Sequence, residues 1–206
     1  MNVAIVVLAR DPLKAKTRLR GALTPRQRAA LAEAMLDDVL RVATSTPWPV
    51  LVVTDARTTA RRARAAGARA LVVPARGTRD AARKGLRRVA LDGAGAAIVI
   101  AADVPLVTPA DLRRIVAAGE RSGVVIVPDR RRSGTNAIYL RPPSRIAPRF
   151  GRGSLAAHRV AAGANGRVLS ISRLALDVDL SPDLDALRRL KRRAGRRTRQ
   201  ALDGAG

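Results

Sequence analysis

The chain has 206 residues, no cysteine, one histidine and an excess of basic over acidic side chains that gives a net charge of +24. This composition excludes a disulfide scaffold, a cysteine nucleophile and a thiolate zinc site, and one Trp, one Tyr and one Phe argue against an aromatic platform for stacking bases. No apolar run reaches the ~20 residues of a membrane-spanning helix, so we expect a soluble, cytoplasmic protein.

The first half of the chain alternates between strand patterns and helix patterns. Residues 2–8 form a continuous apolar run of buried-strand length. Thr24, Pro25 and Gln27 predict a helix start, in which Thr24 is the N-cap and Gln27 closes a capping box. The further elements expected here are strands at 49–54, 70–73 and 96–101 and helices at 60–66 and 78–90.

The second half continues the same alternation. Thr108, Pro109 and Asp111 predict another capped helix start. We expect strands at 124–127 and 136–140, a helix at 154–162, late strands at 167–171 and 176–178, and a last helix from Ser181 into the basic C-terminal residues. Strands alternating with helices predict an α/β sandwich with a mostly parallel sheet.

The positive charge has two interpretations. Almost all the cations are arginines spread along the whole chain, which favours compositional drift on a solvated surface. The basic run at 188–199 could instead be a phosphate-binding tail, or a polar helix face.

In a sheet of this kind, ligands bind beyond the carboxyl ends of the strands. The loop after the first strand carries Lys14, Lys16 and Arg18, and cations there suit a triphosphate. An ordinary basic surface loop is the alternative. The glycine pattern of a Walker A loop is absent.

Three aspartates follow strand-like segments. Asp103 comes directly after the most apolar strand, where a carboxylate can hold Mg²⁺ between phosphate groups or cap the next turn. Asp177 and Asp179 are alternate residues of an extended segment and therefore share one face, so both could reach the same cation. Complementing a helix dipole is the alternative, which suits Asp183 and not Asp177.

Two further segments suit an anion. Gly134-Thr135-Asn136 opens a strand, and Gly151-Arg152-Gly153-Ser154 precedes a helix. Exposed N–H groups at that helix start, with the Ser154 hydroxyl, form an oxyanion site, unless Ser154 is only the N-cap. We interpret His158 as a packing or hydrogen-bonding residue rather than a catalytic base.

Taken in order, these motifs resemble a known family. The segments 16–19, 35–40, 102–106, 134–137, 150–154 and 177–179 are similar to those of the 2-phospho-L-lactate / phosphoenolpyruvate guanylyltransferases of deazaflavin coenzyme (F-420) biosynthesis. The resemblance covers about residues 1–187, which we expect to form a single nucleotidyltransferase domain. Residues 188–206 are left as a basic C-terminal helix or tail.

The resemblance implies a nucleotide-diphospho-sugar transferase (GT-A-like) fold, a three-layer sandwich with a mixed, mostly parallel sheet. It also implies GTP and Mg²⁺ as partners and transfer of GMP to a phosphorylated three-carbon acid: phosphoenolpyruvate, 2-phospho-L-lactate or 3-phosphoglycerate. By this resemblance the metal ligands are Asp103, Asp177 and Asp179, and the acid binds at Thr135, Gly151 and Ser154.

From this we predict magnesium-dependent nucleotidyl transfer. Lys16 and Arg18 hold the β- and γ-phosphates, Asp103 acts with them in catalysis, and Asn136 helps to seat the acid. Because the attacking phosphate oxygen is already anionic, no strong general base is needed.

The alternatives are another nucleotidyl- or glycosyltransferase of this fold, a basic nucleic-acid-binding protein, and a non-catalytic homologue. The segment Gly77-Thr78-Arg79-Asp80 lacks an asparagine that the family usually has there, which keeps the last of these open. A homodimer is compatible with the sequence.

Overall fold

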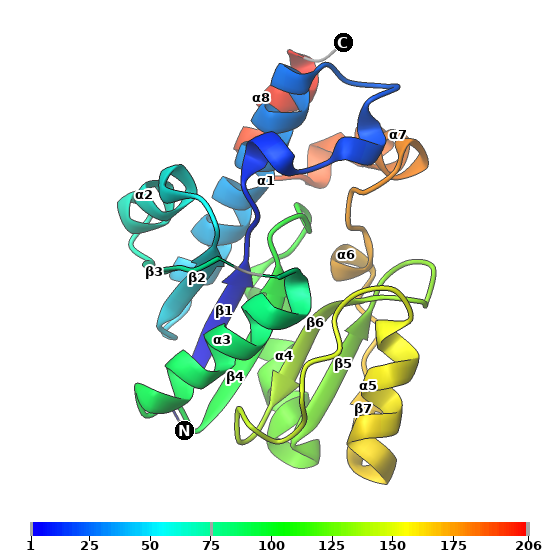
Figure 1. Ribbon diagram of the computed structural model, residues 1–206. Helices are drawn as coiled ribbons and strands as arrows, with labels where there is room; N and C mark the ends of the chain where they lie inside the picture. The colour runs from blue at the N-terminus through cyan, green and yellow to red at the C-terminus, as the bar shows by residue number, and fades with distance from the viewer. Residues whose placement is uncertain (1, 75, 205–206) are drawn as a thin grey trace.

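The computed structural model describes residues 2–74 and 76–204. Its centre is a seven-stranded sheet with the strand order β3-β2-β1-β4-β6-β5-β7 (Figure 1). The strands are β1 (Val3–Leu8), β2 (Val50–Thr54), β3 (Arg69–Val72), β4 (Ala96–Ala101), β5 (Val124–Pro128), β6 (Thr135–Leu140) and β7 (Gly166–Val168). Of the described strands only β6 runs antiparallel to its neighbours, which confirms the predicted mixed, mostly parallel sheet.

Helices connect the strands and cover the sheet. They are α1 (Pro25–Thr44), α2 (Arg57–Ala65), α3 (Thr78–Leu91), α4 (Pro109–Ser122), α5 (Ser154–Ala162), α6 (Ser172–Ala175), α7 (Ser181–Arg189) and α8 (Arg196–Asp203). Short 3₁₀ turns lie at Pro12–Lys14, Thr17–Leu19, Gly163–Asn165 and Lys191–Arg193. The capping boxes predicted at Thr24 and Thr108 are both present. None of the described helices has the length and apolarity needed to cross a bilayer.

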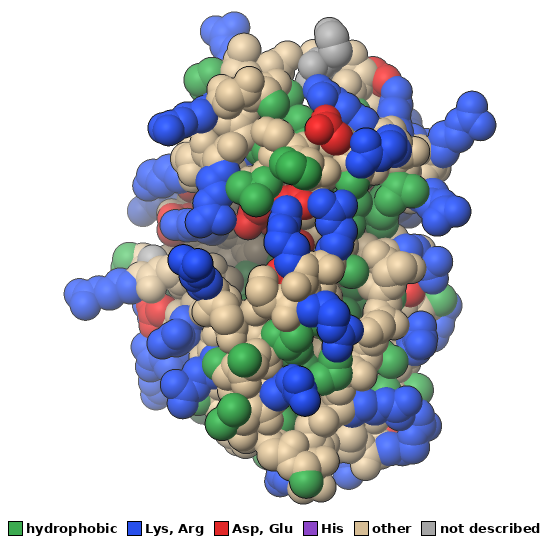
Figure 2. All heavy atoms as spheres, turned by 90° about the vertical axis from the view of Figure 1, so that its right-hand side faces the viewer, with side chains coloured by type: hydrophobic (Ala, Val, Ile, Leu, Met, Phe, Trp, Pro, Cys, Tyr) green, Lys and Arg blue, Asp and Glu red, His purple; other side chains and the backbone are tan. Residues whose placement is uncertain are grey.

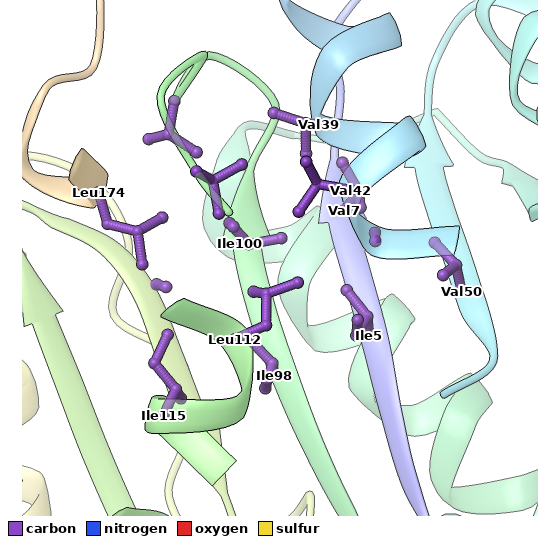
Figure 3. Packing of buried hydrophobic residues seen from close by; sticks show 14 of the residues in the cluster. Ile5, Val7, Val39, Val42, Val50, Ile98, Ile100, Leu112, Ile115 and Leu174 are labelled. Carbon is purple, nitrogen blue, oxygen red and sulfur yellow. The ribbon is translucent and has the colours of Figure 1, made fainter. Parts of the chain in front are cut away.

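The central strands are buried on both faces, and successive side chains point to opposite sides. Ile5 and Ile98 face the layer formed mainly by α1 and α4, where they pack with Leu112 (Figure 3). Val6 and Val99 face the layer formed by α3 and α5. Two apolar clusters on opposite faces of one sheet make the predicted three-layer sandwich.

A third apolar cluster closes one end of the molecule. Leu31 and Met35 of α1 pack with Leu184 and Leu187 of α7 and with Leu202 of α8. In Figure 1, α8 lies alongside α1, beyond the arrowhead end of β1. The basic residues after 187 are therefore carried by short helices that pack on the body of the fold.

The C-terminal segment differs from the prediction in three places. The strand expected at 167–171 is only Gly166–Val168, because the chain leaves the sheet edge and turns into α6. The strand expected at 176–178 is wrong: Leu176 and Val178 insert into the third cluster, and no neighbouring strand pairs with the segment. The last helix, expected to be continuous, is divided at Leu190 and again before Arg196.

Candidate active site

A cleft of about 820 Å³ lies at the carboxyl ends of the parallel strands. It is bordered by residues that follow β1, β2 and β4. Because β6 runs antiparallel, its first residues lie at the same edge: Ile100 pairs with Ala137, so Thr135 and Asn136 sit beside the end of β4. The topology thus brings every residue predicted for the site to the lining of one cavity; these are Lys16, Arg18, Asp103, Thr135, Asn136, Gly151, Ser154, Asp177 and Asp179.

Lys16 lies among the predicted metal ligands. Its Nζ donates to Asp103 and, at 3.1 Å, to Asp179, and only 7% of its side chain is exposed. Burial alone lowers the pKa of Lys16, but the charges of Asp103 and Asp179 outweigh it and hold the pKa above its ordinary value. Lys16 has a φ of 56°, a left-handed conformation that begins the turn Thr17–Leu19. We predicted that Lys16 holds phosphates; here its ammonium neutralises two carboxylates.

Arg18 belongs to the same loop but has a different environment. Its side chain is exposed at the border of the cleft, where it can turn toward an anion. Leu19, the next residue, is fully buried in the third apolar cluster and anchors the loop. Lys14 is mostly exposed and lies 3.9 Å from Asp11.

Asp177 is held by the neighbouring strand. The Asn136 amide donates to Asp177 at 3.1 Å and to the carbonyl of Leu174 at 2.9 Å. Burial, followed by the charge of Asp103, raises the pKa of Asp177 to about 6. Asn136, which we predicted to help seat the acid substrate, therefore holds the Asp177 side chain in place.

Asp179 is positioned by the start of α7. Asp183 is 1% exposed, and its Oδ2 accepts from the backbone N–H groups of Asp179 and Leu180 at 3.2 and 2.9 Å. Arg130 and Arg131 pair with its other oxygen at 3.0 and 2.7 Å. The interpretation of Asp183 as a helix N-terminal charge is consistent with this geometry.

The acid-binding residues predicted from the resemblance lie on the other side of the carboxylates. Ser154 is the first residue of α5, and its N-cap is Gly153, which offers no side chain to the first N–H groups of the helix. Gly151 and Gly153 have φ values of 120° and 70°, which glycine adopts without strain. Thr135 is buried at the start of β6, with its hydroxyl 3.0 Å from His158 Nδ1.

Several lining residues were not anticipated. Asp55 follows β2 and accepts from the N–H of Asp11 at 2.8 Å, which ties two loops together. Asp129 accepts from the N–H of Ser133 and shapes the turn before β6. Thr78 begins α3, whose N-cap, Gly77, also has no capping side chain. A carboxylate directly after a predicted strand was the signal available for Asp55.

The carboxylates provide the chemistry that a hard divalent cation requires. Oxygen ligands are the ones that Mg²⁺ prefers. Burial raises the pKa of Asp177 most, and the charge of Asp103 adds to the rise, so the two carboxylates lie close enough to interact. Within residues 2–74 and 76–204, no three His, Cys, Asp or Glu side chains converge on one metal position. Lys16 lies between Asp103 and Asp179. The carboxylate oxygens suit a cation chemically, but for one to bind they would have to converge and the Lys16 ammonium would have to leave.

Comparison with known proteins identifies the family of the chain. The family model described as "Guanylyl transferase CofC like" matches residues 1–197. A phosphoenolpyruvate guanylyltransferase of Sphaerobacter thermophilus is 36% identical over 193 residues, which cover 91% of this chain and 93% of that protein.

Solved structures support the fold. A protein of Desulfovibrio desulfuricans described as a nucleotide-diphospho-sugar transferase has a TM-score of 0.79 at 17% identity, covering 99% of this chain and 95% of that one. The Mycobacterium tuberculosis protein Rv0371c, in complex with manganese, has a TM-score of 0.53 at 22% identity, covering 91% of this chain and 98% of that one. The fold is the predicted one of the nucleotide-diphospho-sugar transferases.

Proposed function

The chain belongs to the CofC-like guanylyltransferases, and from that membership we propose that it transfers GMP from GTP to phosphoenolpyruvate in deazaflavin coenzyme biosynthesis. A phosphate oxygen of the acid attacks the α-phosphorus of GTP, the bond from that phosphorus to the β-phosphate oxygen breaks, and pyrophosphate leaves. The choice of phosphoenolpyruvate rests on the Sphaerobacter relative.

The observation that carries the proposal is the composition of the cleft. The cavity is lined by Lys16, by the carboxylates of Asp103, Asp177 and Asp179, and by a helix start whose N-cap is a glycine. This arrangement suits two polyanions that react with each other, because cations and a helix N-terminus neutralise and orient phosphates. His158 lines no part of the cleft, in agreement with a reaction that needs no general base.

We assign Mg²⁺ to Asp103, Asp177 and Asp179. Bound there, the cation would neutralise charge on the reacting phosphates and on the leaving pyrophosphate. Asn136 and Asp183 keep Asp177 and Asp179 in place through the hydrogen bonds described above. The manganese of the mycobacterial structure of this fold agrees with a divalent cation.

On the donor side, Lys16 and Arg18 hold the β- and γ-phosphates. With a cation bound to Asp103 and Asp179, the Lys16 ammonium would be released from these two carboxylates and could pair with phosphate oxygens. On the acceptor side, the hydroxyls of Thr135 and Ser154 and the N–H groups after Gly151 bind the acid. This division places the leaving group beside β1 and the attacking group beside β6.

The test is pyrophosphate release with Mg²⁺, each of the four nucleoside triphosphates, and phosphoenolpyruvate, 2-phospho-L-lactate or 3-phosphoglycerate. We expect release with GTP and phosphoenolpyruvate and little with the other pairs. Release with CTP in place of GTP, or none with any acid from the folded protein, would contradict the proposal.

A further inference from the structure

His158 is the single histidine of the chain, and it lies outside the cleft. It is 0% exposed, on α5, and it contacts both segments that border the acid-binding side. Its Nδ1 is 3.0 Å from Thr135 Oγ1, its Nε2 accepts from the N–H of Arg149 at 2.8 Å, and its ring meets Phe150 edge-on. One side chain therefore joins the start of β6 to the loop before α5.

These contacts decide where the ring proton lies. The backbone N–H of Arg149 can only donate, so Nε2 must carry a lone pair. The neutral ring then has its proton on Nδ1 and donates it to Thr135 Oγ1. Burial lowers the pKa of His158 to about 4, which agrees with a neutral ring.

The hydroxyl of Thr135 is oriented as a consequence. Its oxygen accepts from His158, so its own proton points elsewhere, and within the described residues it has no other hydrogen-bond partner. Thr135 lines the cleft, so the proton is available to a ligand there. A hydroxyl fixed as a donor suits an anionic oxygen and not an N–H group.

We infer that His158 is a positioning residue for the acid: it fixes the Thr135 hydroxyl as a donor and holds the loop of Arg149–Ser154 beside it. The inference rests on the proposed function, because it takes the ligand to be a phosphorylated carboxylic acid. A backbone hydrogen bond of 3.2 Å from Leu155 to Ser133 joins the same two segments. We expect this hydrogen bond to keep the two segments together when the imidazole is replaced.

The first experiment reads the tautomer directly. One histidine gives one pair of imidazole ¹⁵N signals, so a ¹⁵N–¹H correlation spectrum needs no assignment by mutation. We expect a protonated Nδ1 and an unprotonated Nε2 at neutral pH, and a shift of the Nδ1 signal when phosphoenolpyruvate is added. A ring protonated on Nε2, or one that phosphoenolpyruvate leaves unchanged, would overturn the inference.

The second experiment separates positioning from folding. His158→Phe keeps a ring and removes both hydrogen bonds, and we expect the KM for phosphoenolpyruvate to rise about tenfold or more while the KM for GTP stays within about twofold. His158→Asn can place an amide N–H near the Nδ1 position and should restore much of the affinity. Combining His158→Phe with Thr135→Val should raise KM by less than the two single effects multiplied together.

The control is Ile115→Ala, which removes buried side-chain volume on the opposite face of the sheet. It should lower the thermal midpoint and leave the KM for phosphoenolpyruvate unchanged. Equal effects of His158→Phe on both substrates, or on stability alone, would overturn the positioning role.

If the wild type turns over no acid, the proposed function fails. Calorimetric binding of phosphoenolpyruvate to the wild type, His158→Phe and Thr135→Val then decides the inference.

Discussion

Lys16 and Asp103 form an ion pair in the free protein, although in the proposed reaction each would bind a different partner. The Lys16 ammonium is almost fully buried, and two carboxylates keep it charged. In the reaction that we propose, the same carboxylates bind a cation and the same ammonium binds phosphates. In the free protein these groups instead bind each other, which holds them at the position where the substrates would bind.

Asp103→Asn tests this arrangement. The amide keeps the shape of the carboxylate and removes its charge, so we expect turnover to fall by about 10²–10³-fold or more. Pyrophosphate release measures it, and the thermal midpoint should change little. Asp92→Asn, which alters a surface carboxylate paired with Arg69 and Arg88, is the control and should retain activity. Normal turnover in Asp103→Asn would remove that residue from the metal site.

His158 makes stability depend on pH. Burial lowers its pKa from 6.5 to about 4, so the unfolded chain takes up the proton first. Its contribution to stability is complete above pH 6.5 and is lost as the pH falls toward 4. The loss by pH 4.5 amounts to about 2 kcal/mol of unfolding free energy.

The measurement is urea unfolding of the wild type and His158→Phe at pH 7.5 and pH 4.5. Asp177, whose pKa is raised to about 6, makes the protein more stable as the pH falls over this range, which opposes the effect of His158. The informative quantity is therefore the difference in unfolding free energy between the wild type and His158→Phe. That difference should narrow by about 2 kcal/mol at the lower pH. A constant difference would show that the pKa of His158 is the same in the folded and the unfolded protein.

At the scale of elements, a glycine sets how closely α4 approaches β6. A Cβ at Gly119 would lie 2.2 Å from the ring of Tyr139, which is fully buried. Glycine has a lower helix propensity than alanine, but only glycine leaves room at this position for the large aromatic side chain.

We expect Gly119→Ala to lower the unfolding free energy by about 1–3 kcal/mol, because overpacking outweighs the gain in propensity. Denaturant unfolding measures it. Gly21→Ala is the matched control, since nothing lies within 4 Å of its Cβ position, and it should change stability by about 0.5 kcal/mol or less. A stabilised Gly119→Ala would mean that Tyr139 moves at little cost.

In the segment around Asp177 and Asp179, the alternation of polar and apolar residues predicted the direction of the side chains correctly but the secondary structure wrongly. Alternation placed both carboxylates on one face and buried Leu176 and Val178 on the other, as expected of an extended chain. The same alternation was interpreted as a strand, which is wrong. Periodicity specifies the direction of side chains, whereas strand pairing requires a neighbour at hydrogen-bonding distance.

At the scale of the whole molecule, the net charge of +24 is distributed rather than concentrated. Figure 2 shows blue lysine and arginine side chains scattered over the visible face, with other side chains between them. A diffuse charge of this kind attracts nucleic acid only through its phosphates.

We therefore expect any nucleic-acid affinity to fall steeply between about 50 and about 200 mM salt. Fluorescence anisotropy with labelled oligonucleotides of unrelated sequence measures it. Guanylyl transfer, which depends on contacts inside the cleft, should decline far less over the same range. Tight, sequence-selective binding at the higher salt would favour a nucleic-acid-binding protein.

The C-terminal residues stabilise the body of the fold. Asp38 of α1 is buried and accepts from the N–H groups of Arg197 and Thr198 at 3.3 and 2.8 Å. Leu202 packs in the same cluster as Leu19, which anchors the loop of Lys16. The Asp38 carboxylate thus caps the start of α8, and α8 packs in the cluster that anchors the loop of Lys16.

Ending the chain after Arg189 should lower stability by about 3–5 kcal/mol, because Asp38 loses its partners and apolar surface is exposed. Urea unfolding measures it, and Leu202→Ala gives a smaller effect of the same sign if the shortened chain does not fold. The exposed Arg199→Gln should be neutral. An unchanged midpoint in both shortened and Leu202→Ala proteins would make the segment a free tail.

The sequence by itself predicted most of the elements and the residues that line the cleft. Apolar runs predicted the central strands, capping boxes predicted the starts of α1 and α4, and carboxylates after strand-like segments predicted the acidic cluster. These signals are local: each depends on residues a few positions apart.

Only the tertiary structure decided which of these groups meet. The contacts of Lys16 with Asp103 and Asp179 join residues 87 and 163 positions apart. The antiparallel direction of β6 brings Thr135 to the carboxyl end of β4, and His158 contacts that threonine. No short sequence pattern indicates either feature. Such contacts depend on how the strands are ordered and how the helices pack against them. Packing stabilises residues that are close in space, and closeness in space cannot be read from their separation along the chain.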